Sequence, residues 1–201
     1  MAGIHNTLVF LGASTGGTEA IKEVLLSLPK EIPPILIVQH MPPVFTASFA
    51  QRLSQLCPFK VKEAEDLEPV CPGIVYLAPG GRHMRIKAVA TGFRIELTDD
   101  PLVNRFRPSV DYLFESALKL KDVRKVAVIL TGMGCDGAKQ MLALNRQGVS
   151  TIAQDEETSV VWGMPGAAVE MGGVDHVIPL QEIGEKLVSV LNSKRTLKKL
   201  A

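Results

Sequence analysis

The stretch LVFLGASTGGTEAI, from Leu8 to Ile21, contains three signals that decide the fold. A short run of apolar and β-branched residues predicts a buried strand over Thr7–Leu11. A glycine-rich turn follows at Gly12–Gly17, and apolar residues at helical spacing then predict a helix over Glu19–Leu28. A turn between a strand and a helix can hold a phosphate or present a nucleophile, which here would be Ser14.

Strand and helix patterns alternate in the same way further along the chain. Two more pairs, each given as a strand and then a helix, are Ile35–Gln39 with Thr46–Leu56 and Val126–Leu130 with Ala138–Gln147. Strands that are apolar on both faces and separated by helices are typical of a parallel sheet covered on both sides. The sequence therefore predicts the α/β class, with a doubly wound, mostly parallel sheet and helices on both faces.

The segment between the second and third pairs has a different pattern. Strand-like runs, separated by the turn sequences PGGRH and ATG, lie at Ile74–Ala78, Met84–Ala88 and Phe93–Leu97. They predict an antiparallel β-hairpin or meander, inserted at one edge of the sheet. Beyond the third pair, two strands and a helix are predicted at Ser150–Ala153, His176–Ile178 and Leu180–Asn192.

Length and charge limit the domain organisation and the partners. The 201 residues are enough for one α/β domain with a continuous core, so we expect a single domain over residues 1–201. The formal net charge of +1 gives no indication of nucleic acid or of an anionic membrane surface as a partner. The basic tail SKRTLKKLA is expected to be a solvated chain end.

Cysteine use and hydropathy indicate a cytoplasmic protein. Cys57, Cys71 and Cys135 are odd in number and far apart, which argues against a disulfide framework and against a structural zinc site. No apolar run approaches the roughly 18 residues of a membrane span, and the first residues lack the basic region of a secretory signal. We therefore expect a soluble protein in a reducing compartment, with no direct membrane insertion.

Three predicted strands end in turns that carry residues suited to catalysis. Ser14 follows TLVFLGA, His40 follows ILIVQ, and Asp136 follows VAVILTGMGC. In open parallel sheets, ligands bind at the carboxyl ends of the strands, near the point where the strand order reverses. We therefore expect Ser14, His40 and Asp136 to converge on one crevice.

Serine, histidine and an acid are together the residue types that catalyse acyl transfer. A serine hydroxyl becomes a useful nucleophile when a neutral imidazole takes its proton and an acid holds that imidazole in the right tautomer. Attack on a carbonyl also builds negative charge on oxygen, which backbone N–H groups of a glycine-rich turn stabilise. The turn TGMGCDGA, Thr131–Ala138, is of this type, and the N–H of Met133 or of a neighbour is the expected donor. Thr15 is expected to line the site beside Ser14.

Each motif also has a simpler interpretation. GASTG matches the G-x-S-x-G nucleophile elbow, but the elbow belongs to a fold in which the acid precedes the histidine, and here the order is Ser, His, Asp. The Gly12–Gly17 turn could instead bind a nucleotide in a Rossmann-like domain, although it lacks the G-x-G-x-x-G spacing. It could also be purely structural, with His40 a hydrogen-bonded strand end and Asp136 a helix cap. Only the combination of the three residues favours a hydrolase.

Other polar residues are weaker candidates. His83 is expected in a surface loop, with the rim of the crevice as the alternative. Arg105 and Arg107 precede a helix start at Pro108-Ser109, and they either anchor an acidic substrate segment or brace their loop. No group of His, Asp and Glu has metal-ligand spacing, so the expected chemistry needs no metal and no cofactor.

Six blocks of the sequence, taken together, closely resemble the catalytic domain of the chemotaxis protein-glutamate methylesterases, the CheB family. The blocks are GASTGGTEAI, QHMPPVFTASFAQRL, VKEAEDLEPVCPGIVYLAPGGRHM, NRFRPSVD, ILTGMGCDGA and TIAQDEETSVVWGMPGAAVEMGGVD. They follow the order of the family and cover nearly the whole chain.

The resemblance implies a serine esterase that hydrolyses glutamyl methyl esters on the cytoplasmic regions of methyl-accepting chemoreceptor proteins and also deamidates receptor glutamines. It places the catalytic residues on Ser14, His40 and Asp136, and an oxyanion contact on the backbone of Met133. Family members usually begin with a phosphorylatable receiver domain, which is a further partner in the full-length family context. The competing hypotheses are the nucleotide-binding domain and a receptor-binding module without catalytic activity.

Overall fold

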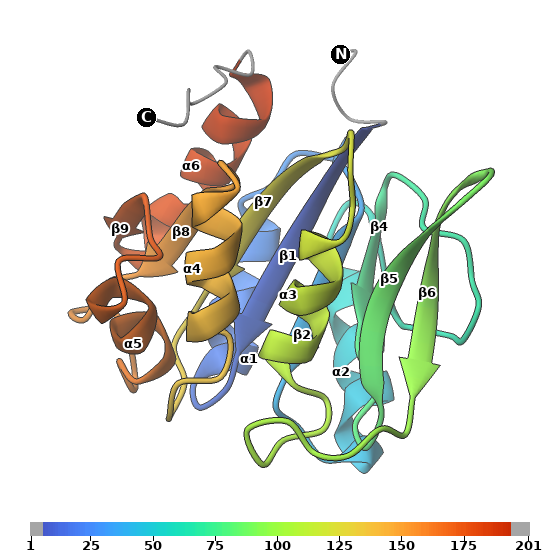
Figure 1. Ribbon diagram of the computed structural model, residues 1–201, viewed down its shortest axis with the longest axis horizontal. Helices are drawn as coiled ribbons and strands as arrows, with labels where there is room; N and C mark the ends of the chain where they lie inside the picture. The colour runs from blue at the N-terminus through green and yellow to red at the C-terminus, as the bar shows by residue number, and fades with distance from the viewer. Residues whose placement is uncertain (1–5, 194–201) are drawn as a thin grey trace.

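A seven-stranded sheet forms the centre of the protein (Figure 1), whose structure is a computed structural model that describes residues 6–193. The basic tail, which is expected to be a solvated chain end, lies outside the described residues after Ser193. The strands lie side by side in the order β3 (Lys60–Glu63), β4 (Ile74–Leu77), β2 (Ile35–Gln39), β1 (Thr7–Ala13), β7 (Arg124–Ile129), β8 (Ser150–Gln154) and β9 (His176–Ile178). Every neighbouring pair in this sheet is parallel.

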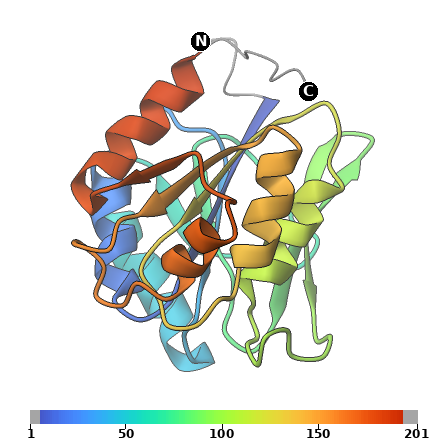
Figure 2. The ribbon, with the colours of Figure 1, turned by 60° about the vertical axis from the view of Figure 1, so that its left-hand side comes forward.

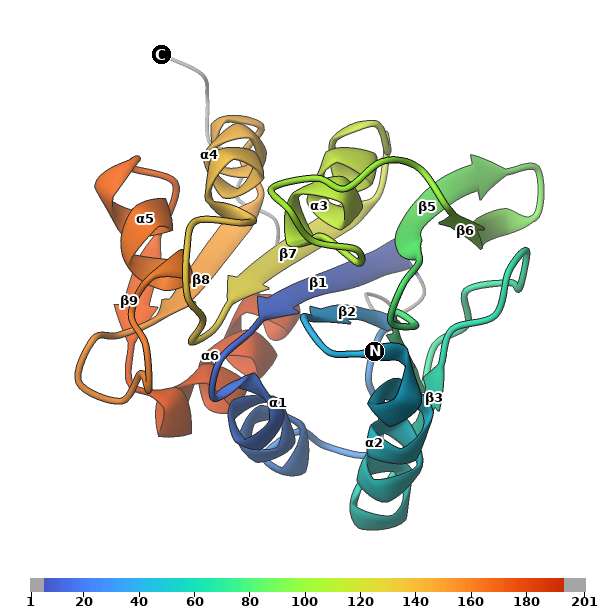
Figure 3. The ribbon, with the colours of Figure 1, turned by 90° about the horizontal axis from the view of Figure 1, so that it is seen from below.

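Helices cover both faces of the sheet, which Figure 3 shows end-on. One face carries α1 (Gly17–Leu26), α2 (Pro43–Leu56) and α6 (Leu180–Asn192). The other face carries α3 (Val110–Leu118), α4 (Ala138–Arg146) and α5 (Met164–Glu170). Strands β1 and β2 are buried throughout because both of their faces pack against helices. The predicted doubly wound α/β fold is therefore confirmed.

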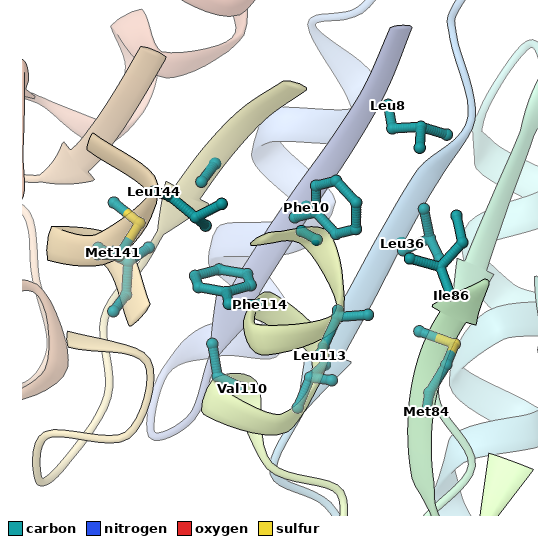
Figure 4. Close-up of a cluster of buried hydrophobic side chains, with 14 of the residues drawn as sticks. Leu8, Phe10, Leu36, Met84, Ile86, Val110, Leu113, Phe114, Met141 and Leu144 are labelled. Carbon is teal, nitrogen blue, oxygen red and sulfur yellow. The ribbon is translucent and has the colours of Figure 1, made fainter. Parts of the chain in front are cut away.

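Alternate residues of β1 point into two separate hydrophobic clusters. Phe10 belongs to the cluster of the α3 and α4 face, together with Phe114 and Leu144 (Figure 4). Leu11 belongs to the cluster of the opposite face, together with Ile21 of α1. Close packing on both sides fixes the position of β1 and hence the position of the turn that follows it.

The antiparallel hairpin is present, but it is smaller than the sequence pattern predicts. β5 (His83–Val89) and β6 (Gly92–Thr98) pair as a separate two-stranded sheet. This sheet is attached to α3, where the N–H of Ile86 donates to Ser116 Oγ at 3.1 Å. The assignment of Ile74–Ala78 to the hairpin or meander is wrong, because β4 lies inside the main sheet between β2 and β3.

The strand order reverses between β1 and β7. From β1 the chain continues through α1 to β2 on one side, whereas β7 pairs with the other edge of β1. The turn after β1 leads to α1, and the turn after β7 leads to α4 on the opposite face, as Figure 2 shows from another side. The two turns therefore diverge at the carboxyl ends of the strands, which is where open α/β sheets bind their ligands.

Candidate functional site

Ser14 is the first residue after β1, and backbone hydrogen bonds tie this end of β1 to both neighbouring strands. The N–H of Ser14 donates to Thr131 O at 3.0 Å, and the N–H of His40 donates to Ala13 O at 3.1 Å. These bonds continue the parallel ladders beyond the strands, so the three strand ends lie side by side. Because Ala13 pairs with Gln39, Ser14 and His40 are the next residues on adjacent strands.

The buried side chain of Gln39 connects the two strand ends further. Its Nε2 donates to Ser14 O at 2.9 Å and to His40 O at 3.1 Å. A Cβ atom at Gly17 would come within 2.1 Å of Gln39 Oε1, so only glycine leaves room for this amide. One side chain therefore holds the backbone of Ser14 and of His40 in a common position.

His40 and Asp136 form a buried pair. His40 Nε2 lies 2.8 Å from Asp136 Oδ2, and the two side chains are 7% and 0% exposed. Phe106 stacks on the imidazole, with ring centroids 3.8 Å apart and an interplanar angle of 9°. This stacking and the bond to Asp136 fix the plane and the direction of the ring.

Asp136 accepts hydrogen bonds from the N-terminus of α3 and from the loop before it, as well as from His40. The donors are Val110 N–H at 2.6 Å, Ser109 Oγ at 2.7 Å, Asn104 Nδ2 at 2.7 Å and Asp111 N–H at 3.2 Å. Burial alone would favour the neutral acid, but the hydrogen bonds outweigh it and lower the pKa of Asp136. The carboxylate is therefore ionised at neutral pH and can only accept, so His40 Nε2 carries the proton of this bond.

Ser14 and His40 are not hydrogen bonded to each other in this structure. His40 Nδ1 is buried and has no hydrogen-bond partner, and Ser14 Oγ makes no hydrogen bond to it within the described part of the chain. Because Nε2 is bonded to Asp136, Nδ1 is the nitrogen left to take a proton from a hydroxyl. The structure thus brings the three predicted residues to one edge of the sheet and joins two of them.

The turn after β7 places Gly132 directly against Ser14. A Cβ atom at Gly132 would lie 2.7 Å from Ser14 Cβ, so only glycine permits this approach. The backbone of Gly132 is held from the other side, where its N–H donates to Val161 O at 2.9 Å and its oxygen accepts from Met164 N–H at 2.7 Å. The next N–H, that of Met133, has no acceptor among residues 6–193. The Met133 N–H is therefore left without an internal acceptor among the residues that the structure describes, one residue beyond the glycine that lies against Ser14.

The N-terminus of α1 is where a nucleotide phosphate would have to bind. Gly16, with φ at 80°, precedes the helix, and a Cβ atom there would come within 2.6 Å of Val160 Cγ2. The first turn of α1 carries Glu19. The apolar side chain of Val160 beside this turn does not favour a bound phosphate, and the Glu19 carboxylate is already paired with Lys22 Nζ at 2.6 Å. Thr15 lies exposed at the same turn, and its carbonyl accepts from Thr131 Oγ1 at 2.9 Å.

His83 is buried at the start of β5, so its expected place in a surface loop is wrong. Its ring stacks on Tyr112 with centroids 4.2 Å apart. Nδ1 accepts from Ser109 N–H at 3.3 Å, and Nε2 lies 3.0 Å from Pro101 O. This arrangement requires a neutral ring with its proton on Nε2. The turn PGGRH predicts an exposed residue, but the loop before α3 folds over the ring and covers it.

This buried histidine makes the stability of the protein depend on pH. Burial lowers the pKa of His83 below its ordinary value of 6.5, so as the pH falls the unfolded chain binds this proton first. The free energy of unfolding is expected to fall as the pH is lowered below about 6.5, and to fall less in a His83→Gln variant. Urea titrations of both proteins at about pH 7.5 and about pH 5.5 measure the difference. Equal losses in the two proteins would contradict this account.

The two arginines of the loop before α3 have different environments. Arg107 Nη1 donates to the carbonyl oxygens of Asp99 at 2.8 Å and Asp100 at 3.1 Å, as the bracing alternative predicts. Arg105 is exposed and makes no hydrogen bond or ion pair within residues 6–193. It therefore remains the candidate for contact with an acidic substrate segment.

The same loop contributes three residues that the sequence pattern does not single out. Asn104 and Ser109 hydrogen bond to Asp136, and Phe106 stacks on His40. A signal for Ser109 exists, because a serine after proline marks a helix start, whose free N–H groups attract a carboxylate. For Asn104 and Phe106 the contact depends on how the loop folds back, which no local pattern reveals.

The described residues contain neither a metal-binding cluster nor a membrane-spanning helix. Between residues 6 and 193, no group of three or more His, Cys, Asp or Glu side chains is arranged to hold a metal ion. None of the helices in this range has both the length and the apolar composition for crossing a bilayer. A cavity of about 760 Å³ lies where β7 and β8 begin, at the opposite end of the strands, and no candidate residue lines it.

The fold and the candidate site together define a class, that of α/β proteins with Ser, His and Asp gathered where the strand order of a parallel sheet reverses. Comparison with known proteins gives the family. The family model described as CheB methylesterase matches residues 9–187. The chain therefore belongs to the CheB methylesterase family.

Named relatives and a solved structure agree with this assignment. The chain is 52% identical over 181 residues to a protein-glutamate methylesterase/protein-glutamine glutaminase of Bradyrhizobium diazoefficiens, covering 90% of this chain and 50% of the relative. It is 50% identical to the protein of the same name in Escherichia coli, covering 95% of this chain and 55% of the relative. The chain thus spans about half the length of the curated relatives it matches. The crystal structure of the Thermotoga maritima CheB methylesterase catalytic domain matches with a TM-score of 0.88 and 43% identity, covering 91% of this chain and 97% of that one.

Proposed function

We propose that this chain is a protein-glutamate methylesterase that hydrolyses glutamyl methyl esters on the cytoplasmic regions of chemoreceptors and also deamidates receptor glutamines. The single observation that carries the proposal is the buried His40–Asp136 pair, 2.8 Å apart, in which His40 directly follows the strand that pairs with the strand before Ser14. The names of the relatives, protein-glutamate methylesterase/protein-glutamine glutaminase, support the choice of substrate.

In the first half of the proposed reaction, Ser14 Oγ attacks the γ-carbonyl carbon of the methylated glutamate. Its proton passes to His40 Nδ1, the nitrogen that Asp136 leaves free. The carbonyl oxygen becomes an oxyanion, to which the Met133 N–H donates. When the tetrahedral intermediate collapses, the bond to the methoxy oxygen breaks and methanol leaves with the proton from His40.

In the second half, water hydrolyses the acyl-enzyme. His40 takes a proton from the water, the hydroxide attacks the acyl carbon, and the proton then returns to Ser14 as glutamate is released. With a glutamine as substrate, the same steps release ammonia in place of methanol. Throughout, Asp136 stays ionised and orients the imidazole, in agreement with the lowered pKa of its carboxyl group.

The surroundings of Ser14 suit a substrate that is itself a protein. Thr15 is exposed beside Ser14, and Met133 is 70% exposed. We propose that both line a shallow cleft into which a receptor helix presents its ester. We also propose that the chain acts as one catalytic domain in the cytoplasm, with receptors as its partners and with a receiver domain as a second partner in the full-length family context.

The experiment that tests the proposal measures methanol release together with covalent labelling. Receptor membranes that carry radiolabelled methyl esters are incubated with the protein without any added cofactor, and volatile label is counted. In parallel, a serine-directed fluorophosphonate is added and the modified peptide is identified by mass spectrometry. We expect methanol release and a label on Ser14.

Two outcomes would replace the proposal. Receptor binding with unchanged methylation would identify a binding module without catalytic activity. If the protein released no methanol and bound NAD(P) or ATP at millimolar concentration or below, the hypothesis that the Gly12–Gly17 turn binds a nucleotide would be favoured.

A further inference from the structure

Two buried carboxylates share one amide group beside the candidate site. Asn104 Nδ2 donates to Asp136 Oδ1 and to Asp111 Oδ2, at 2.7 Å in each case. Asp136 is 1% exposed and Asp111 is 7% exposed, so water screens neither charge well. Each of the two N–H bonds of the amide therefore points at one carboxylate, and the amide lies between two groups that would otherwise repel each other.

The two oxygens of Asp136 have different surroundings. Oδ2 accepts from His40 Nε2 at 2.8 Å and from Val110 N–H at 2.6 Å. Oδ1 accepts from Asn104 Nδ2, Ser109 Oγ and Asp111 N–H. Rotation of the carboxylate about its Cβ–Cγ bond would disturb both sets of bonds, so the donors to Oδ1 also determine how Oδ2 faces the imidazole.

Among these donors, Asn104 is the one that does not belong to the N-terminus of α3. Ser109 is the N-cap of the helix, and the backbone N–H groups of Val110 and Asp111, which also donate to Asp136, belong to its first turn. Asn104 lies in the preceding loop with φ at 52°, in the left-handed region. Its second acceptor, Asp111, also accepts from Gln140 N–H of α4 at 3.2 Å. The amide therefore connects Asp136 to a carboxylate that is already anchored between α3 and α4.

We propose that Asn104 is a positioning residue for the esterase reaction, because its amide bridges Asp136 and Asp111 and thereby keeps Asp136 Oδ2 directed at His40 Nε2. This inference rests on the proposed function, in which His40 is the base. Without the amide, the two carboxylates lose the donor that they share, and Asp136 is held only by the N-terminus of α3 and by His40, so Oδ2 is directed less consistently at His40 Nε2. Neutral His40 then no longer keeps its proton on Nε2, and Nδ1 is no longer consistently free to take the proton of Ser14.

The first variant is Asn104→Gly, because glycine accepts the left-handed backbone without strain and lacks the side chain that carries the amide. We expect kcat for methanol release to fall between about 10-fold and about 100-fold, with KM within about twofold of wild type. The melting temperature is measured alongside to show that the variant is folded. Asp122→Gly is the matched control, since Asp122 is exposed, has φ at 56° and precedes β7 at the other end of the sheet.

The second variant, Asn104→Asp, gives a pH signature that a merely structural role would not produce. The new carboxyl group has the same shape as the amide and also tolerates a left-handed backbone, but when ionised it has no proton to donate. Beside two other carboxylates its pKa is raised, so at lower pH it is partly protonated and still donates one hydrogen bond. The ratio of variant to wild-type kcat is therefore expected to decrease as the pH rises.

A third measurement is independent of activity. Nitrogen-15 NMR of the His40 ring, recorded on a Ser14→Ala protein, reports which ring nitrogen carries the proton. We expect the Nε2–H tautomer to dominate with Asn104 present and to be mixed with the Nδ1–H tautomer in the Asn104→Gly background. Unchanged tautomers together with unchanged kcat would overturn the positioning role. If the wild-type protein releases no methanol, the proposed function fails instead, while the tautomer measurement still tests the contact of Asn104.

Discussion

Replacing Ser14 with alanine is expected to reduce methanol release from methylated receptors by about 10⁴-fold or more, because the variant has no atom that can form the acyl-enzyme. The change removes only a hydroxyl group. Since Ser14 is held by its backbone N–H and carbonyl, the turn after β1 keeps its bonds to Thr131 O and Gln39 Nε2. We therefore expect a folded protein with an unchanged melting temperature that still binds receptor.

The neighbouring hydroxyl provides the comparison. Thr15 is exposed at the same turn, and its carbonyl oxygen, rather than its side chain, accepts the hydrogen bond from Thr131 Oγ1. Thr15→Ala is expected to retain methanol release to within about tenfold, in contrast to Ser14→Ala. If Ser14→Ala released methanol at the wild-type rate, or if Thr15→Ala were the inactive variant, the assignment of the nucleophile would be wrong.

Replacing Asp136 with asparagine is expected to lower kcat by about 10⁴-fold, although the side chain keeps its shape. The carboxylate accepts five hydrogen bonds, including those from His40 Nε2 and Val110 N–H, and an amide nitrogen cannot accept any of them. If the amide nitrogen faces His40, it donates to Nε2 and forces the proton onto Nδ1. That tautomer cannot take the proton of Ser14.

Stability should change together with activity in this variant. The pKa of Asp136 is lowered in the folded protein from its ordinary value of 3.8. The ionised carboxylate therefore stabilises the fold at pH values above 3.8, and this contribution is lost as the pH falls below 3.8. We expect Asp136→Asn to be less stable than wild type at neutral pH and to lose less stability in strong acid. Steady-state kinetics and urea titrations measure the two effects. A variant with kcat within tenfold of wild type would show that His40 does not depend on this carboxylate.

The elements that the sequence predicts well are those whose apolar pattern agrees with their burial. β2 and α6 have the predicted bounds, Ile35–Gln39 and Leu180–Asn192, because the first four residues of β2 are apolar and α6 has a clear apolar stripe at helical spacing. The sequence pattern does not predict β3 (Lys60–Glu63), because it is a short edge strand with charged residues. The sequence pattern also does not predict α5 (Met164–Glu170), because Pro165 and Gly166 are weak helix formers.

The assignment of β4 failed for a topological reason. Its sequence is followed by a glycine-rich turn and a real hairpin, so proximity along the chain favours antiparallel pairing with β5. Its actual partners are β2 and β3, which precede it, and both pairs are parallel. Local patterns report burial and turns, whereas the choice of partner depends on the path of the intervening helices.

The candidate site was predictable to the extent that it follows from strand ends. Ser14 and His40 each follow a buried strand, and parallel strands place such residues at one edge of the sheet. Asp136 lies several residues beyond β7, and its position depends on donors from the N-terminus of α3. That helix precedes β7 in the sequence, so the contact exists only after α3 has packed on the sheet beside the turn that leads from β7 to α4.

The reversal of strand order at β1 also determines how activity would be lost under stress. Ser14 leads into the α1 layer, whereas Asp136 is held by α3 in the opposite layer. Proteins open locally before they unfold globally, and opening of either layer would separate Ser14 from Asp136, the proposed nucleophile and acid. The working lifetime of the protein is therefore set by the less stable of its two helical layers, rather than by the stability of the molecule as a whole.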